Sequence, residues 1–205
     1  MRHSWLSRSK FFPIAVASLV GGSALDLIGT YVYQPDFQYE NNPIYAFLRQ
    51  HGYSPGWPEV IAAKLGVCVI FAIGLRQFLR KRRDYYRPRP SSFREFTTHF
   101  FFGRPLPWLQ TFYRIPRFLP TLIYFVAVCS LSGPYCAFLG YDNLAGKYGW
   151  RSLGGFWLGS TWIHYGVIIW AVLASAWLCW DMWRDYQDTD DTDQDDTSVQ
   201  TEAAA

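Results

Sequence analysis

Six polar residues of this chain lie in or beside apolar stretches, where a polar side chain is costly to place. They are Asp26, Thr30, Glu40, Asn42, Lys64 and His164. Carboxylate, amine and imidazole groups can pair as ions, transfer protons or ligate cofactors. Ionisable residues within membrane spans are rare and usually face the protein interior or a cavity. These residues are therefore the candidates for a buried polar site.

Four segments are long and apolar enough to cross a bilayer, which takes about 20 helical residues. They cover residues 11–33, 58–79, 118–140 and 155–183. The sequence therefore predicts an all-α integral membrane protein, with four transmembrane helices packed as a bundle. The first segment has a second interpretation, because basic residues, an apolar run and "GGSA" resemble a cleavable signal peptide. Apolar residues continue to Val32, which favours a retained helix.

Lys and Arg are distributed unevenly between the connecting segments, and this bias predicts the orientation of the spans. The loop at residues 76–117 holds eleven basic and two acidic residues, and the N-terminus is also basic. We therefore expect a multi-pass protein of a bacterial inner membrane with both termini in the cytoplasm. Aromatic residues alternate with Arg in this loop, a pattern typical of an interfacial segment on anionic lipid. A loop tethered between two spans is not expected to bind nucleic acid.

The segment after the last span is polar throughout. Residues 184–205 have almost no apolar content, which predicts a disordered acidic tail. Its "DTDDTDQDD" run lacks the Gly and the terminal Glu of a calcium-binding loop, so no metal site is predicted there. The four cysteines show no metal-type spacing and are expected to be small core residues. They are Cys68, Cys129, Cys136 and Cys179.

Asp26 and Lys64 should meet inside the membrane. At 1.5 Å per residue, Asp26 lies about 10 Å below the outer end of the first span and Lys64 about 9 Å below that of the second. A short outer loop would hold the two groups at one depth, and a paired buried charge costs less than an isolated one. We therefore predict an ion pair. Thr30 lies one turn from Asp26 on the same face, and His164 lies about 13 Å into the fourth span.

Asp-x-x-x-Thr in the first span, Glu-x-Asn-Pro in the outer loop and Lys in the second span form a recognisable combination. It resembles a group of small bacterial multi-span membrane proteins that share a domain of unknown function. The matching positions are Asp26, Thr30, Glu40, Asn42, Pro43 and Lys64. The resemblance covers the first third of the chain and implies that these residues belong to one site. It implies no particular activity.

Two interpretations of this polar set remain open. Asp26 and Lys64 can be a structural ion pair, or Asp26, Glu40 and Lys64 can supply a catalytic carboxylate or a route for protons or ions. His164 is expected to be a hydrogen-bonded interior histidine. Haem held between two histidines is disfavoured, because only one of the four His lies within a span. Ligation of a chlorophyll-type pigment by His164 alone stays open.

Helix packing and catalytic motifs complete the prediction. Gly155 and Gly159 form a Gly-x-x-x-Gly pair that permits close helix approach, and Gly133-Pro134 should kink the third span. No GxSxG, HExxH, GxGxxG or P-loop is present.

The leading hypothesis is a non-catalytic accessory or assembly subunit of a larger inner-membrane complex. The alternative is a small membrane-embedded enzyme or transporter with an outward-facing polar site, built from Asp26, Glu40, Asn42, Lys64 and His164.

Overall fold

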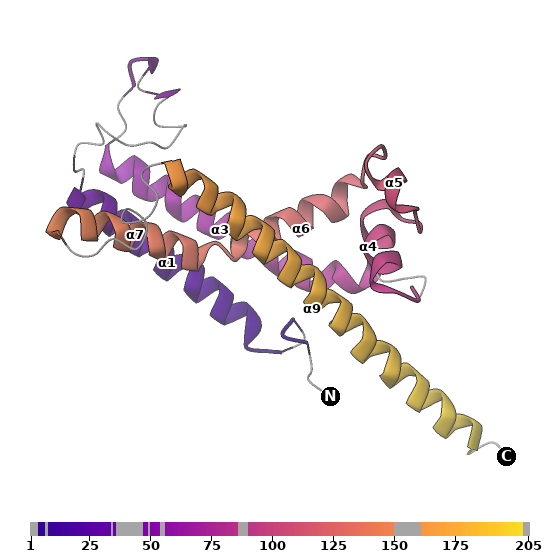
Figure 1. Ribbon diagram of the computed structural model, residues 1–205. Coiled ribbons are helices and arrows are strands. Elements are labelled where there is room, and N and C mark those ends of the chain that lie inside the picture. The colour runs from indigo at the N-terminus through magenta and orange to yellow at the C-terminus, as the bar shows by residue number, and fades with distance from the viewer. Residues whose placement is uncertain are drawn as a thin grey trace. The chain divides into compact units, whose positions relative to one another are not determined.

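The computed structural model describes most of the chain, and within the described residues the fold is all-helical, as predicted (Figure 1). Described are residues 4–6, 8–33, 35, 47–48, 50–53, 56–85, 90–149 and 161–202, without the side chains of 108, 161–164 and 188–202. The elements are α1 (Phe11–Tyr33), α3 (Trp57–Lys81), η1 (Arg82–Tyr85), α4 (Phe93–Phe102), α5 (Trp108–Thr111), α6 (Phe118–Ser130), α7 (Gly133–Tyr148) and α9 (Thr161–Glu202).

Among the described residues, four helical stretches are long and apolar enough to cross a membrane, as the sequence predicts. They are Phe11–Tyr33, Trp57–Tyr85, Phe118–Tyr148 and Tyr165–Gln187. A bilayer core offers no water to backbone N–H and C=O groups, so apolar runs of this length must satisfy them within a helix. Most residues of each stretch are not buried within the protein, as expected of surfaces that face lipid.

The third span is broken between α6 and α7, where the sequence predicts a kink. Pro134 lacks a backbone N–H and its ring disturbs the preceding helical turn. The carbonyl of Leu131, inside the break, accepts a hydrogen bond from the indole N–H of Trp170 at 3.2 Å. This bond satisfies a backbone group that would otherwise be unpaired in an apolar setting. It also gives a mid-span tryptophan a structural role.

The chain divides into two compact units, and α1, α3, α6 and α9 each contribute residues to both. Unit 1 consists of Met1–Pro13, Gly74–Val128 and Leu173–Ala205, and unit 2 of Ile14–Ile73 and Cys129–Val172. Each unit has its own buried side chains. The packing of all four spans into a single bundle stays a prediction.

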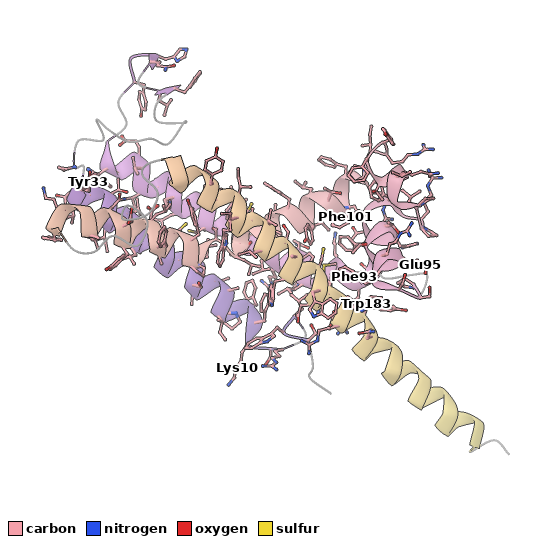
Figure 2. The ribbon with its side chains drawn as sticks, in the orientation of Figure 1. Lys10, Tyr33, Phe93, Glu95, Phe101 and Trp183 are labelled. Carbon is pink, nitrogen blue, oxygen red and sulfur yellow. The ribbon has the colours of Figure 1, made fainter. Side chains whose placement is uncertain are left out.

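Unit 1 has an aromatic core around α4. This helix begins at the N-cap Ser92 and ends at Gly103, whose φ of 77° closes the last turn in the left-handed conformation. The ring centroid of Phe93 lies 6.2 Å from that of Trp183 in α9 (Figure 2). Phe96, one turn after Phe93, contacts Trp183 with ring centroids 5.5 Å apart. Phe96 is only 2% exposed. Part of the basic loop is therefore packed into the core of unit 1.

The sequence predicts a disordered tail at residues 184–205, but in the structure α9 continues beyond Trp183. The helix runs to Glu202, and Asp185 and Tyr186 are buried in unit 1. The buried residues follow a helical stripe at i, i+3, i+4, i+7 and i+8, namely Leu178, Asp181, Met182, Asp185 and Tyr186. The start of the predicted tail is thus an integral part of the fold, because its amphipathic face packs on unit 1.

Candidate functional site

The structure contains the predicted ion pair between α1 and α3 in unit 2. The Nζ atom of Lys64 lies 2.6 Å from Oδ2 of Asp26. The side chains keep 30% and 17% of their surface exposed, respectively, so the pair is partly buried. Position along the two predicted spans was sufficient to predict this contact, because Asp26 is the only charged residue in the sequence 11–33 and Lys64 has the matching position in 58–79.

Other polar groups extend the site along one face of α1, where Ser23, Asp26 and Thr30 follow the i, i+3, i+7 spacing. The thiol of Cys68 in α3 lies 3.5 Å from Oγ of the buried Ser23. The amide of Asn143 in α7 donates to Oγ1 of Thr30 at 3.4 Å. Three helices therefore supply hydrogen-bonding partners to a polar strip inside an apolar unit.

Two thiols lie near the ion pair. Cys68 and Cys136 are both close enough to Lys64 to interact with it electrostatically, and Cys136 also interacts with Asp26. All four cysteines of the chain are free thiols. Sequence reasoning treated these two only as small core residues, and their separate spans gave no signal that they approach the same pair.

The remaining predicted site residues lie outside the part that the structure describes. This applies to Glu40, Asn42 and Pro43, and to the packing pair Gly155 and Gly159. His164 is in α9, but its side chain is also outside the described part. Of the predicted cluster, the structure thus brings together Asp26 and Lys64 and places Thr30 one turn away.

A close contact between α1 and α7 positions this site. Gly22 and Gly29 of α1 face Gly133 and Gly140 of α7, and a Cβ added at any of the four would lie within 3.0 Å of the other helix's backbone. Only glycine allows backbones to approach so closely. Gly140 contacts the backbone at Leu25 and Asp26, so this contact fixes the part of α1 that carries the carboxylate.

The same contact fixes the direction of the two helices. Gly133 faces the segment from Ser18 to Gly22, whereas Gly140 faces the segment from Leu25 to Gly29. Residue numbers increase together along both helices, so α1 and α7 are parallel. The sequence contains the signal as two glycine pairs spaced by seven residues, which a search for Gly-x-x-x-Gly does not detect.

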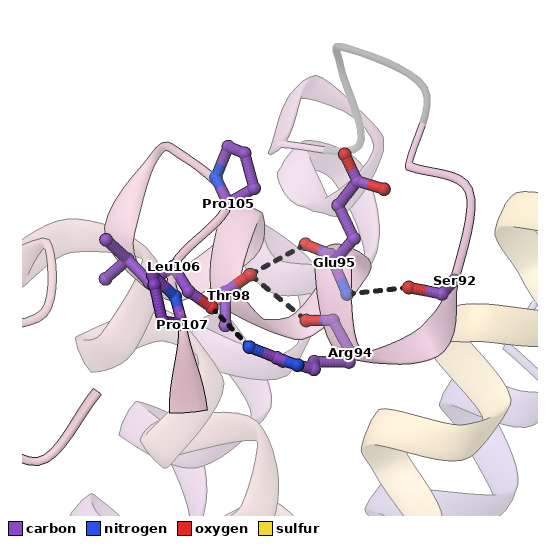
Figure 3. A pocket seen from close by; sticks show the side chains of 7 residues that line it. All are labelled: Ser92, Arg94, Glu95, Thr98, Pro105, Leu106 and Pro107. Atoms are coloured by element: carbon purple, nitrogen blue, oxygen red, sulfur yellow. Dashed lines mark hydrogen bonds between the residues drawn. The ribbon is translucent and has the colours of Figure 1, made fainter. Parts of the chain in front are cut away.

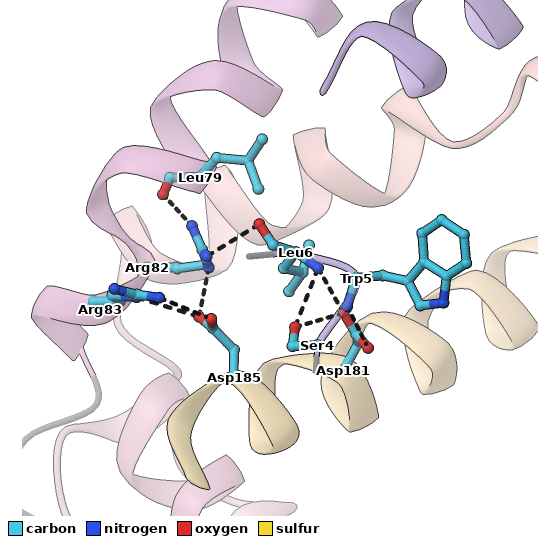
Figure 4. Close-up of polar contacts among 8 residues, drawn as sticks. All are labelled: Ser4, Trp5, Leu6, Leu79, Arg82, Arg83, Asp181 and Asp185. Atoms are coloured by element: carbon cyan, nitrogen blue, oxygen red, sulfur yellow. Dashed lines mark hydrogen bonds and ion pairs between the residues drawn. The ribbon is translucent and has the colours of Figure 1, made fainter. Parts of the chain in front are cut away.

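Unit 1 contains a second set of buried charges, which sequence reasoning missed (Figure 4). Asp185 of α9 is fully buried, and its Oδ2 accepts from Nε of Arg82 at 2.9 Å. Its Oδ1 lies 3.1 Å from Nη2 of the half-exposed Arg83. Arg82 also donates to the carbonyls of Leu79 and Leu6. A buried carboxylate between two guanidinium groups joins η1, which directly follows α3, to α9.

Asp181, one turn before Asp185, binds the segment that precedes α1. Its carboxylate accepts from the hydroxyl of Ser4 at 2.8 Å and from the backbone N–H groups of Trp5 and Leu6 at 3.2 and 2.8 Å. Ser4 and Leu6 are buried. These contacts give the residues before α1 a structural role.

A hollow of about 330 Å³ beside α4 has its polar groups already engaged (Figure 3). Ser92 accepts from the backbone N–H of Glu95, and Arg94 donates to the carbonyl of Leu106. Hydrogen bonds from the side chain and backbone of Ser91 hold the pKa of the exposed Glu95 carboxyl below its usual value. Ser92 therefore caps the N-terminus of α4 and Glu95 is the acidic residue of its first turn, so these groups have a structural role.

His99 is the buried histidine of α4. Burial lowers its pKa, and the nearby Arg117 guanidinium lowers it further, so the ring is neutral at physiological pH. Its Nδ1 has no hydrogen-bond partner among the described residues. The described part of the chain contains no group of three or more His, Cys, Asp or Glu residues able to hold a metal ion.

Removing either member of the Asp26–Lys64 pair should destabilise the protein. We expect Asp26→Asn and Lys64→Met each to lower the free energy of unfolding by about 2–3 kcal/mol, somewhat below the cost for fully buried pairs. Each variant leaves one unpaired charge in an apolar region. Unfolding in mixed micelles measures the effect. The double variant should recover much of the loss, whereas additive losses would mean that the two groups act independently.

No protein-family model, curated protein or solved structure matches this chain. Its description as a helical membrane protein therefore depends on the four long apolar helices in the part of the chain that the structure describes.

Proposed function

We propose that the chain is a non-catalytic integral membrane protein that serves as an accessory or assembly subunit of a larger inner-membrane complex. One observation carries the proposal: three acidic groups that are buried or partly buried in the described spans are engaged in contacts within the protein. Asp26 binds Lys64, Asp185 binds two arginines, and Asp181 binds the segment before α1. These ion pairs and hydrogen bonds satisfy each carboxylate, which supports a structural role.

Outward-facing aromatic rings on α9 support association with other membrane proteins. Trp177 and Trp180 remain 38% and 53% exposed, and Tyr165 is also exposed. Large aromatic residues dominate the energetics of protein interfaces and also anchor helices at the headgroup level. Further membrane subunits would cover these rings in the assembled complex.

Purification in mild detergent followed by native mass spectrometry tests the proposal. We expect the chain to leave the membrane together with other integral membrane proteins, and to retain them in the Asp26→Asn/Lys64→Met variant. A chain that purifies only as a monomer or homodimer would contradict the proposal.

A second candidate function is a small enzyme or transporter that uses the outward-facing site. The observation that favours it is the gathering of the Asp26–Lys64 pair, two thiols and the Thr30–Asn143 contact. This function predicts a small molecule that co-purifies with the wild type. The molecule should be lost from Asp26→Asn/Lys64→Met although that variant stays folded.

We also propose that both termini lie in the cytoplasm, on the side of the basic loop. The Lys and Arg bias of the sequence supports this orientation. Two sets of contacts support an orientation with both termini on one side. First, α1 and α7 are parallel, as we expect of the first and third spans. Second, within unit 1 the residues before α1 bind both α9 and Arg82, which follows α3, as we expect of groups on the same side of a membrane.

Cysteine labelling in intact cells measures this orientation. In a background without the native cysteines, Ser54→Cys should react with an impermeant thiol reagent added from outside, and Gln110→Cys should react only after the membrane is opened. Gln110 is exposed, so its lack of reaction would reflect the membrane barrier. The reverse pattern would contradict the proposed orientation.

The basic loop, residues 76–117, is proposed to contact anionic lipid at the cytoplasmic surface. Exposed apolar and aromatic side chains accompany its arginines, for example Phe112 and Tyr113. An exposed basic segment near an anionic leaflet gains about 1 kcal/mol for each Lys or Arg. This contact would hold the loop against the membrane beside any partner subunit.

A further inference from the structure

The second half of the basic loop is closed at its base. The backbone N–H of Arg117 donates to the carbonyl of Phe101 at 2.7 Å. The Arg117 guanidinium also donates to the carbonyl of Phe100 at 2.9 Å, at the end of α4. Between these bonded residues the chain leaves α4 at Gly103, which has the left-handed conformation. The segment 103–117 therefore leaves α4 and returns to it before α6 begins.

This closure brings two arginines to one hollow of about 340 Å³. Arg104 stands near the start of the segment and Arg114 near its end, and both are exposed. Neither guanidinium has a hydrogen-bond or ion-pair partner among the residues that the structure describes. The other lining residues are Phe102, Leu106, Tyr113 and Ile115. Two unpaired cations thus share a concave surface with aromatic and aliphatic walls.

The rim of this hollow is apolar and exposed. Tyr113 is 86% and Ile115 92% exposed, and the nearby residues Leu109, Phe112 and Phe118 in the sequence are exposed as well. Phe118 is also the first residue of α6, with which the third span begins. An exposed apolar surface of this kind marks an interaction site. Because the chain continues from here into a helical stretch that is long and apolar enough to cross a membrane, we expect this surface to lie next to the bilayer.

We propose that this hollow binds the phosphate group of an anionic glycerophospholipid, while the apolar rim enters the adjoining acyl region. The inference rests on the proposed contact of the basic loop with anionic lipid and names the site within it. Guanidinium groups present planar sets of donors that match phosphate oxygens. The apolar rim favours a lipid over a soluble anion, since free phosphate has no group to occupy that surface.

Native mass spectrometry of the purified full-length chain with added phospholipid tests the site. The wild type should bind one phosphatidylglycerol more tightly than phosphatidylcholine. Arg104→Gln/Arg114→Gln should weaken this first binding about 25-fold, since each arginine near an anionic group contributes roughly a fivefold factor. Both residues are exposed, so the thermal unfolding of the variant should match that of the wild type.

Arg76→Gln/Arg80→Gln is the matched control, because it removes the same charge from two exposed residues of α3 outside the hollow. This control should keep the tight phosphatidylglycerol binding. An equal loss in both double variants, or in neither, would overturn the site. Displacement of the lipid by inorganic phosphate would show a soluble-anion site instead. A wild type without preference for phosphatidylglycerol would refute the proposed lipid contact of the loop itself.

Discussion

Replacing Asp185 with alanine should lower the free energy of unfolding by about 3–5 kcal/mol, because it removes the common partner of two arginines. Asp185 is fully buried, and the side chain of Arg82 is only 6% exposed. Without the carboxylate, the Arg82 guanidinium remains desolvated and keeps only the carbonyls of Leu6 and Leu79. Chemical unfolding in mixed micelles measures the loss.

Asp84→Ala provides the control for this prediction. Asp84 is exposed and lies in η1 beside the two arginines, so its removal should change stability by no more than about 0.5 kcal/mol. Arg82→Met combined with Asp185→Leu should recover part of the loss, because both buried charges are then absent. A small effect of Asp185→Ala, similar to that of Asp84→Ala, would mean that the buried ion pair does not hold α9 to α3.

The spans were predictable because the bilayer sets their length and polarity. The first predicted span, residues 11–33, coincides with α1, and the second differs from α3 by one to two residues at each end. The third helical stretch extends to Tyr148, beyond the predicted residue 140. Its last turns contain Asp142, Asn143 and Lys147, whose polarity hides a continuing helix from a search for apolar runs.

The site was predictable where two opposite charges have matching positions in neighbouring apolar spans. Asp26 and Lys64 are such a pair, and the structure brings them together. Asp181 and Asp185 belong to a run of acidic residues, and overall composition assigned Asp185 to a tail. Leu178, Met182 and Tyr186, which form a helical stripe together with these two aspartates, indicated instead that the helix continues. Local periodicity was therefore a better guide than composition at this boundary.

Replacing Gly140 with alanine should cost about 3 kcal/mol or more, at the upper end of overpacking effects. The new Cβ would lie 2.6 Å from the backbone nitrogen of Asp26 and closer still to the neighbouring carbonyl of Leu25. Backbone atoms cannot change rotamer, so α1 and α7 must separate. Separation removes the backbone packing along the glycine contact and displaces the Asp26 carboxylate from Lys64.

Gly21→Ala is the control that isolates this effect. Gly21 is adjacent to Gly22 in α1, but a Cβ at Gly21 meets no atom within 4 Å, whereas one at Gly22 meets the backbone of Gly133. Gly22→Ala should therefore destabilise the protein like Gly140→Ala, and Gly21→Ala should not. The comparison cancels the general preference of helices for alanine over glycine. Equal stability of Gly21→Ala and Gly22→Ala would contradict the close packing of α1 on α7.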